Sequence, residues 1–193
     1  MLHKPKYEIM GQYLGDYTKE VYGRQLIGKV TLSHKGIALA LEELQDQSIL
    51  KSHSLGNRKL YGLNFMNKEI KDILCITEII KKILFFQKER KIAYLFNQDK
   101  RIVGIFGSYA CGTDKKESDI DIFIVGEKKK DDYEKKSDVL GLQVSIKYFS
   151  EKEMKKLLLK KNNLWKEIVK NHILIFGAEQ FISLLWGNYY GLS

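Results

Sequence analysis

Cysteine, proline and long apolar runs are scarce in this 193-residue sequence, which has two cysteines and one proline. Two cysteines, Cys75 and Cys111, are too few for a disulfide framework or a cysteine-ligated zinc site. No apolar run approaches the roughly 20 residues that a membrane-spanning helix needs, and the N-terminus does not follow the pattern of a secretory signal. We therefore expect a cytoplasmic protein with no membrane span.

The sequence has fewer acidic than basic residues. It contains 33 lysines and arginines and 24 aspartates and glutamates, which gives a formal net charge of +9. An excess of positive charge favours an acidic partner, and nucleic acid and nucleotides are the natural candidates. A lysine-rich surface that only promotes solubility would give the same composition. The 44% of hydrophobic residues is typical of a globular protein, and the length allows one large domain or two small ones.

The most informative segment begins with the apolar residues 102–106 and continues as Gly-Ser-Tyr-Ala-Cys-Gly through residues 107–112. In a second apolar segment, Asp119 and Asp121 alternate with Ile120 and Ile122. The pattern predicts a strand, a tight turn, a short helix and a second strand. Both carboxylates would lie on one face of the second strand and both isoleucines would face the core. A solvated strand start can carry such an acidic pair by chance, but the whole pattern is more selective.

Two carboxylates at this spacing suit a hard divalent cation such as Mg²⁺ or Mn²⁺. The turn at Gly107 and Ser108 offers backbone N–H groups and a hydroxyl to phosphate oxygens. The segment resembles the DNA polymerase beta-like nucleotidyltransferase superfamily, especially its minimal members. The resemblance implies an α+β domain with a mixed β-sheet flanked by helices, and often a separate helical partner protein. It also implies catalytic and metal-binding roles for Asp119 and Asp121, and binding of a nucleoside triphosphate by Gly107, Ser108 and Ser118.

One acidic residue that the superfamily uses is missing from this sequence. Catalytic members usually supply a third carboxylate from the next strand, predicted here over residues 142–149, and Ser145 stands where that acid is expected. Lys147 lies two residues further along the same face. Neither side chain is an anionic metal ligand, and the loss of such a group typically lowers the rate by about 10²–10⁴. Nucleotide and Mg²⁺ binding are therefore expected, and catalysis is left open.

The first 66 residues follow a different pattern. Apolar residues at helical spacing predict helices over residues 5–17, 20–27 and 34–45, and Ser33 is a good N-cap for the third. Residues 49–53 and 60–64 then read as two strands joined by a turn.

This arrangement resembles the winged helix-turn-helix fold, in which the third helix enters the DNA major groove and the hairpin contacts the backbone. A dimerisation or protein-docking module of the same fold is the alternative. For DNA binding, the resemblance implies contacts by the start of the third helix, the turn before it and the hairpin: Thr31, Ser33, His34, Lys35, Ala38, Lys51, Asn57, Arg58 and Lys59.

Three regions are expected: a winged helix-turn-helix at residues 1–66, a helical connector at 67–97 and a nucleotidyltransferase-like domain at 98–193. The connector is predicted as one long helix, or as two with a bend near residues 88–90, and a helical segment at 92–96 leads into the next strand. Its apolar stripe suits packing within one chain or pairing with a second copy in a homodimer. Further on we expect a helix capped by Ser150, a helix at 163–171, a strand at 172–177, a final helix at 178–186 and a packed aromatic tail.

Two functions are compatible with these features. The first is a DNA-binding transcriptional regulator whose nucleotidyltransferase-like domain binds nucleotide and Mg²⁺ without full activity. The second is an active enzyme that transfers a nucleoside monophosphate from a triphosphate to a hydroxyl of a protein, small molecule or nucleic acid, by in-line attack on the α-phosphorus. Ser145 and Lys147 favour the first function, whereas the intact Gly-Ser turn and both aspartates favour the second.

Overall fold

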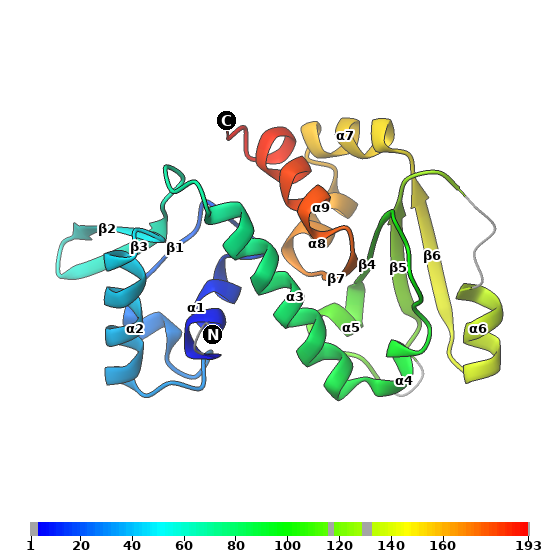
Figure 1. Cartoon of the computed structure of the whole chain (residues 1–193), viewed down its shortest axis with the longest axis horizontal. Coiled ribbons are helices and arrows are strands. Elements are labelled where there is room, and N and C mark those ends of the chain that lie inside the picture. The colour runs from blue at the N-terminus through cyan, green and yellow to red at the C-terminus, as the bar shows by residue number, and fades with distance from the viewer. Residues whose placement is uncertain (1–3, 116–117, 129–132, 193) are drawn as a thin grey trace. The chain divides into compact units, whose positions relative to one another are not determined.

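The computed structural model describes residues 4–115, 118–128 and 133–192, and the chain forms two compact units, residues 1–77 and 78–193 (Figure 1). The boundary between the units falls inside the helix α3 (Ile70–Lys88). Each unit has a sheet of its own. Within the described residues, none of the helices has the length and apolar character needed to cross a membrane.

The N-terminal unit combines short helices with a three-stranded antiparallel sheet in the order β1-β3-β2. Strands β2 and β3 form a hairpin in which Leu55 pairs with Arg58, so Gly56 and Asn57 make the turn. Gly56 has a φ of 57°, which glycine adopts without strain. The elements in chain order are α1 (Lys4–Met10), the 3₁₀-helix η1 (Gly11–Tyr13), β1 (Glu20–Val21), the 3₁₀-helix η2 (Gly23–Leu26), α2 (His34–Asp46), β2 (Leu50–Leu55) and β3 (Arg58–Leu63).

Helix α2 confirms the predicted third helix. The Ser33 hydroxyl accepts a hydrogen bond of 3.2 Å from the Gly36 N–H and so caps the first turn. The apolar side chains recur every three or four residues and form one buried face, made of Ile37, Ala40, Leu41 and Leu44. The helix therefore forms where local capping and the hydrophobic pattern agree.

The first two predicted helices are corrected by the structure. Helix α1 ends at Met10 and continues only as the 3₁₀ turn η1, so it does not reach residue 17. The predicted helix at residues 20–27 is instead the strand β1 followed by η2. Val21 is buried and pairs with Tyr61, while Glu20 pairs with Gly62. Pairing with β3 satisfies the backbone groups of these residues, so a tertiary contact overrides the local helical pattern.

The C-terminal unit contains a four-stranded mixed sheet in the order β6-β5-β4-β7, flanked by helices. Strands β5 and β6 are parallel and the other two pairs are antiparallel, which confirms the expected mixed sheet. The strands are β4 (Ile102–Phe106), β5 (Ile120–Val125), β6 (Val144–Phe149) and β7 (Ile173–Phe176). The other elements after α3 are α4 (Arg90–Ala93), α5 (Gly107–Cys111), α6 (Tyr133–Leu140), α7 (Glu151–Leu159), α8 (Asn163–Lys170), α9 (Ala178–Leu184) and the π-helix η3 (Leu185–Tyr189).

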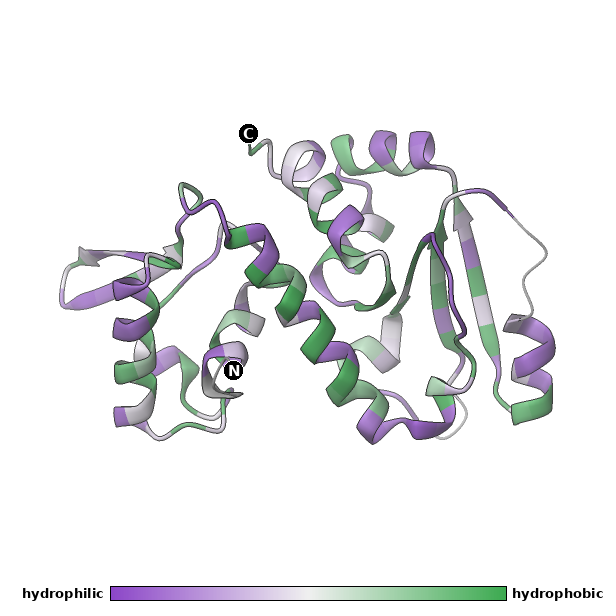
Figure 2. Ribbon diagram, viewed as in Figure 1, coloured by the Kyte–Doolittle hydropathy of each residue, from purple (hydrophilic) through white to green (hydrophobic). Residues whose placement is uncertain are grey.

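The central strands of this sheet are covered on both faces, and β4 is largely green in the hydropathy colouring of Figure 2. On one face, the Phe123 ring of β5 lies 5.8 Å from the Trp165 ring of α8 and 5.9 Å from the Phe181 ring of α9. On the other face, Ile122 belongs to a buried cluster that includes Ile92 of α4 and Tyr133 of α6. Burial of both faces explains why β4 and β5 are almost continuously apolar.

Three local predictions for this unit are confirmed. The Ser150 hydroxyl accepts a hydrogen bond from the Glu153 N–H and the Glu153 carboxylate accepts one from the Ser150 N–H, which is a capping box. The bend after α3 falls at Glu89, the residue between α3 and α4. The aromatic tail packs on the unit, with Trp186 buried.

A fully buried ion pair joins α3 to the start of β7. The His172 Nε2 atom lies 2.8 Å from a carboxylate oxygen of Glu78, and both side chains are 0% exposed. The His172 Nδ1 atom faces the carbonyl oxygens of Ile168 and Val169 at 2.8 and 3.1 Å. Burial alone would raise the pKa of Glu78, but the charges of His172 and Lys81 and the hydrogen bond from His172 lower it below its ordinary value. The lowered pKa of Glu78 therefore contributes stability above the unfolded carboxyl pKa, and this contribution is lost as the pH falls through the lowered folded pKa.

We predict that His172→Leu lowers the free energy of unfolding by about 3–5 kcal/mol, because the Glu78 carboxylate would remain buried without its partner. Urea unfolding at neutral pH measures this loss. The double variant Glu78→Leu/His172→Leu should recover most of it, since no unpaired charge remains. A loss below about 1 kcal/mol in the single variant would show that the pair is not a stabilising element.

Candidate functional site

The candidate site of the C-terminal unit lies where β4 ends and β5 and β6 begin. Asp121 on β5 pairs with Phe106, the last residue of β4, and with Ser145 near the start of β6. The chain leaves β4 at Gly107 and turns directly into α5. The register of three strands therefore places the Asp121 side chain beside the Gly-Ser turn.

The Asp121 carboxylate lies against Gly107. A Cβ atom built at position 107 would lie 2.5 Å from the Asp121 Oδ2 atom, and the φ angle of Gly107 is 70°. Both the close approach and the left-handed backbone exclude a larger residue. Glycine is required at this position for the turn and the carboxylate to occupy neighbouring space.

The two aspartates differ in environment. Asp121 is half-buried, whereas Asp119 is exposed and lies one residue before β5 begins. The strand starts at Ile120, whose N–H donates to the Gln143 carbonyl, so the expectation that Asp119 lies within the strand is corrected. Ile120 and Ile122 are buried as predicted. Burial raises the pKa of Asp121, and the negative charges of Asp119 and Glu167 raise it further, while Lys147 and a hydrogen bond from Ser145 oppose the shift.

Ser145 and Lys147 on β6 both act on Asp121. The Ser145 hydroxyl hydrogen-bonds to the Asp121 side chain, and the positive charge of Lys147 favours its ionised form. Parallel pairing explains this arrangement, because Asp121 is opposite Ser145 and Phe123 is opposite Lys147. The residue found at the expected place of a third acid therefore lies opposite Asp121 and opposes the rise in its pKa.

Glu167 is a residue near the site that the sequence did not indicate. It lies on the exposed side of α8, and its charge acts on Asp121. Helix α8 is held over this face of the sheet by Trp165, which packs on Phe123 two residues after Asp121. Only this tertiary packing brings Glu167 near the aspartates, so no local sequence pattern points to it.

The two serines of the predicted nucleotide site have different roles. Ser108 is half-buried in the first turn of α5, and across the described part of the chain its hydroxyl makes no hydrogen bond. The Ser118 hydroxyl accepts a hydrogen bond of 2.8 Å from the Lys115 N–H, and the Ser118 N–H donates to the Lys115 carbonyl. Ser118 therefore shapes the loop before β5, whereas Ser108 has a free hydroxyl beside Gly107.

The donor atoms of this site suit a hard cation. Asp119 and Asp121 provide carboxylate oxygens, the ligand type that Mg²⁺ and Mn²⁺ prefer. In the described ranges, no group of three or more His, Cys, Asp or Glu side chains is placed to hold a metal ion. A cation at the two aspartates would thus need further oxygen ligands from water or from a bound phosphate.

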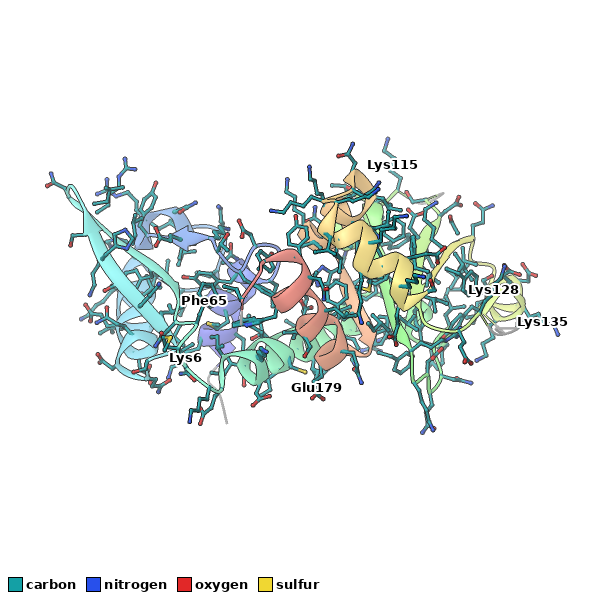
Figure 3. All side chains as sticks on the ribbon, turned by 90° about the horizontal axis from the view of Figure 1, so that it is seen from above. Lys6, Phe65, Lys115, Lys128, Lys135 and Glu179 are labelled. Carbon is teal, nitrogen blue, oxygen red and sulfur yellow. The ribbon has the colours of Figure 1, made fainter. Side chains whose placement is uncertain are left out.

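Several exposed lysines lie on the C-terminal unit. Lys115, Lys128 and Lys135, labelled in Figure 3, are exposed, and the Lys128 ammonium lies 5.3 Å from the centre of the Tyr148 ring. Lys115 belongs to the loop that carries Ser118 before β5. These charges contribute to a positive potential that attracts anions to the unit.

The predicted DNA-contacting residues of the N-terminal unit divide into two groups. Five of them (His34, Ala38, Asn57, Arg58 and Lys59) line one cavity between α2 and the hairpin. The Thr31 hydroxyl hydrogen-bonds to the Glu8 carboxylate, and Ser33 caps α2, so both side chains are engaged in the fold. Lys35 is exposed, and Lys51 lies on β2 with its ammonium 5.9 Å from the centre of the Phe65 ring.

The cavity is also lined by Tyr22 and Arg24, which the sequence did not indicate because both were assigned to a helix.

We predict that Gly107→Ala lowers the free energy of unfolding by at least about 1 kcal/mol, because a side chain in the left-handed region alone costs about 1–2 kcal/mol. The added methyl group would also collide with Asp121. Gly187→Ala is the matched control, since its Cβ would meet nothing within 4 Å and its φ is not positive. Equal thermal unfolding of the two variants would contradict the assignment of Gly107 to the site.

Comparison with known proteins gives the chain its family. Residues 68–181, more than half of the chain, match the family described as "Polymerase beta, Nucleotidyltransferase". A solved structure named "Crystal structure of the toxin-antitoxin with AMP-PNP" is 25% identical, with a match that covers 50% of this chain and 78% of that chain at a TM-score of 0.34. No curated protein matches the chain. The chain therefore belongs to the polymerase beta nucleotidyltransferase family.

Proposed function

We propose that this protein is a DNA-binding regulator whose nucleotidyltransferase domain binds a nucleoside triphosphate with Mg²⁺. In this proposal residues 1–66 form a winged helix-turn-helix that binds DNA, residues 67–97 connect the two parts, and residues 98–193 bind nucleotide. The observation that carries the DNA-binding part is the gathering of Arg24, Arg58 and Lys59 around one cavity beside α2.

The order of elements in the N-terminal unit supports a winged helix. A short strand precedes α2, a two-stranded hairpin follows it, and the third strand joins the hairpin in the order β1-β3-β2. Arg58 and Lys59 follow the two-residue turn at the tip of the hairpin and are exposed. A basic hairpin tip can neutralise phosphates without reading sequence.

The proximity of Asp121 to Gly107 supports nucleotide binding in the second unit. Asp119 and Asp121 would hold Mg²⁺, which when bound neutralises charge on the phosphates. The N–H groups of the turn and the Ser108 hydroxyl would donate to phosphate oxygens. Ser145 replaces the third carboxylate of catalytic relatives and donates to Asp121 instead, so binding is favoured over rapid transfer.

We predict that a non-hydrolysable ATP analogue with Mg²⁺ raises the melting temperature of the full chain. At a concentration of about 100 times Kd the stabilisation should be about 2.7 kcal/mol. Asp119→Asn/Asp121→Asn should abolish this shift, because the metal ligands lose their charge. Glu134→Gln/Asp138→Asn, at two exposed positions of α6, is the charge-matched control and should keep it. A shift that survives in the double variant would place the nucleotide elsewhere.

An active nucleotidyltransferase is the second candidate, favoured by the retention of both aspartates and the glycine turn. In that case label from an α-labelled nucleoside triphosphate would pass to an acceptor in cell extract, and the Asp119→Asn/Asp121→Asn variant would not transfer it. Ser145→Asp should then raise the rate by about 10² or more, because it restores an acid where the family carries one. No transfer by the wild-type protein or by Ser145→Asp would reject this candidate.

We predict that Arg58→Ala/Lys59→Ala weakens binding of the full chain to duplex DNA. The plot of log K against log salt should also become less steep by about 2, because each lost phosphate contact reduces the slope by about 0.9. Gel shifts over a series of salt concentrations measure both effects. Lys29→Ala/Lys68→Ala removes two exposed charges from the same unit, outside the cavity, and should change the slope less. Equal slopes for the two double variants would reject the hairpin as a DNA contact.

A further inference from the structure

The cavity of the N-terminal unit has the size and lining of a ligand site. It has a volume of about 480 Å³, within the range of about 300–1,000 Å³ that is common for small-ligand sites. Three elements form its walls: η2, the first half of α2 and the tip of the β2–β3 hairpin. Its lining contains no aspartate or glutamate and consists of Tyr22, Gly23, Arg24, His34, Ala38, Leu41, Asn57, Arg58, Lys59 and Tyr61.

The cations of this cavity lack acidic partners. Among the described residues, Arg24, Arg58 and Lys59 form no salt bridge with a carboxylate. The Arg58 guanidinium lies instead 5.1 Å from the centre of the Tyr22 ring, and the Lys59 ammonium lies 5.1 Å from that of Tyr61. Three uncompensated charges around one hollow attract an anion strongly.

The outer face of α2 is poorly suited to read base edges in a duplex. The commonest specific contact to a base edge is made by Arg or Lys to guanine, and Asn or Gln pair with adenine. After Lys35 the exposed residues of this helix are Ala38, Leu39, Glu42, Glu43 and Asp46. Glu43 is paired with Lys6, but Glu42 and Asp46 repel phosphates, so the more favourable contacts of the unit are the cations of the cavity.

The cavity is large enough for one nucleotide and too small for a base-paired duplex. Tyr22 and Tyr61 supply aromatic rings, and Ala38 and Leu41 supply apolar surface, next to the arginines. Aromatic surface beside positive charge is how proteins bind unpaired nucleotides, since every base has a face that stacks. The lining thus matches both the phosphate and the base of a single nucleotide.

We propose that this cavity binds an unpaired nucleotide, with its phosphate between Arg24 and Arg58 and its base against Tyr22. This inference rests on the proposed nucleic-acid binding of the N-terminal unit and makes its ligand more specific. The shared chemistry is a nucleoside phosphate, which a single strand or a free mononucleotide can supply. The N-terminal unit then holds an unpaired nucleotide in the cavity and uses the hairpin tip for the neighbouring backbone.

The experiment measures fluorescence anisotropy of a labelled 15-nucleotide oligo-dT with the full chain, without divalent cations so that Asp119 and Asp121 do not contribute. Arg24→Ala should weaken binding about tenfold and lower the salt slope by about 0.7, the value for one phosphate of a single strand. Tyr22→Leu should weaken it about tenfold through lost stacking, and Tyr22→Phe should preserve it. Unlabelled dTMP should compete with the oligonucleotide for binding to the wild-type protein, and much less for binding to Arg24→Ala.

Lys29→Ala is the matched control and should change binding less than twofold, because an exposed charge outside the cavity contributes little.

Several outcomes separate this inference from DNA binding itself. If Arg58→Ala/Lys59→Ala weakens duplex binding while Arg24→Ala and Tyr22→Leu leave oligo-dT and dTMP binding unchanged, the cavity proposal is overturned and DNA binding stands. If dTMP binds in an Arg24-dependent way while duplex and single strand do not bind, the cavity proposal stands and DNA binding fails. If neither oligo-dT nor dTMP binds, the cavity proposal is also overturned. Urea unfolding of each variant checks that the unit remains folded.

Discussion

The contact between the Asp121 carboxylate and Gly107 ties the site of the C-terminal unit to its fold. Strand β5 lies between β4 and β6, so Asp121 is beside the end of one strand and the start of the other. Only a residue without a side chain fits at the turn. Because side chains alternate along a strand, a slip of one residue would turn Asp121 toward the core and an isoleucine toward the turn. The burial of Ile120 and Ile122 therefore fixes the register on which the site depends.

The groups that raise and lower the pKa of Asp121 come from several elements of the C-terminal unit. Burial and the negative charges of Asp119 and Glu167 raise its pKa, while Lys147 and Ser145 favour the ionised carboxylate. A bound cation would act in the same direction as Lys147 and Ser145 and relieve the repulsion between the aspartates. Ser145 thus provides a hydrogen bond where an acid would add a third negative charge.

The N-terminal unit shows the opposite electrostatic arrangement. Its cavity gathers Arg24, Arg58 and Lys59 without any acidic residue in the lining. The arginine and the lysine of the hairpin lie over tyrosine rings, which orders their side chains without neutralising their charge. Preordered cations lose less conformational freedom when an anion binds. The two units therefore differ in the charge that they gather: carboxylates at Asp119 and Asp121 in one, cations around the cavity in the other.

The sequence by itself determined the parts that depend on local order along the chain. The alternation of Asp119, Ile120, Asp121 and Ile122, the Gly-Ser turn after an apolar strand, and the Ser150 capping box were all visible as short-range patterns. Helix α2 was predicted for the same reason, because capping and hydrophobic spacing agree there. Strand β1 was not, since its residues have helical spacing and become a strand only by pairing with β3.

The tertiary structure alone decided which distant residues meet. The charge of Glu167 acts on Asp121 because Trp165 packs α8 onto β5. Arg24 lines the same cavity as the hairpin cations because η2 lies beside α2. The buried Glu78–His172 pair joins residues 94 positions apart. Local sequence encodes backbone preference and the direction in which each side chain points, but contacts between elements depend on how their buried faces pack. That packing is a property of the whole core and cannot be read from any single segment.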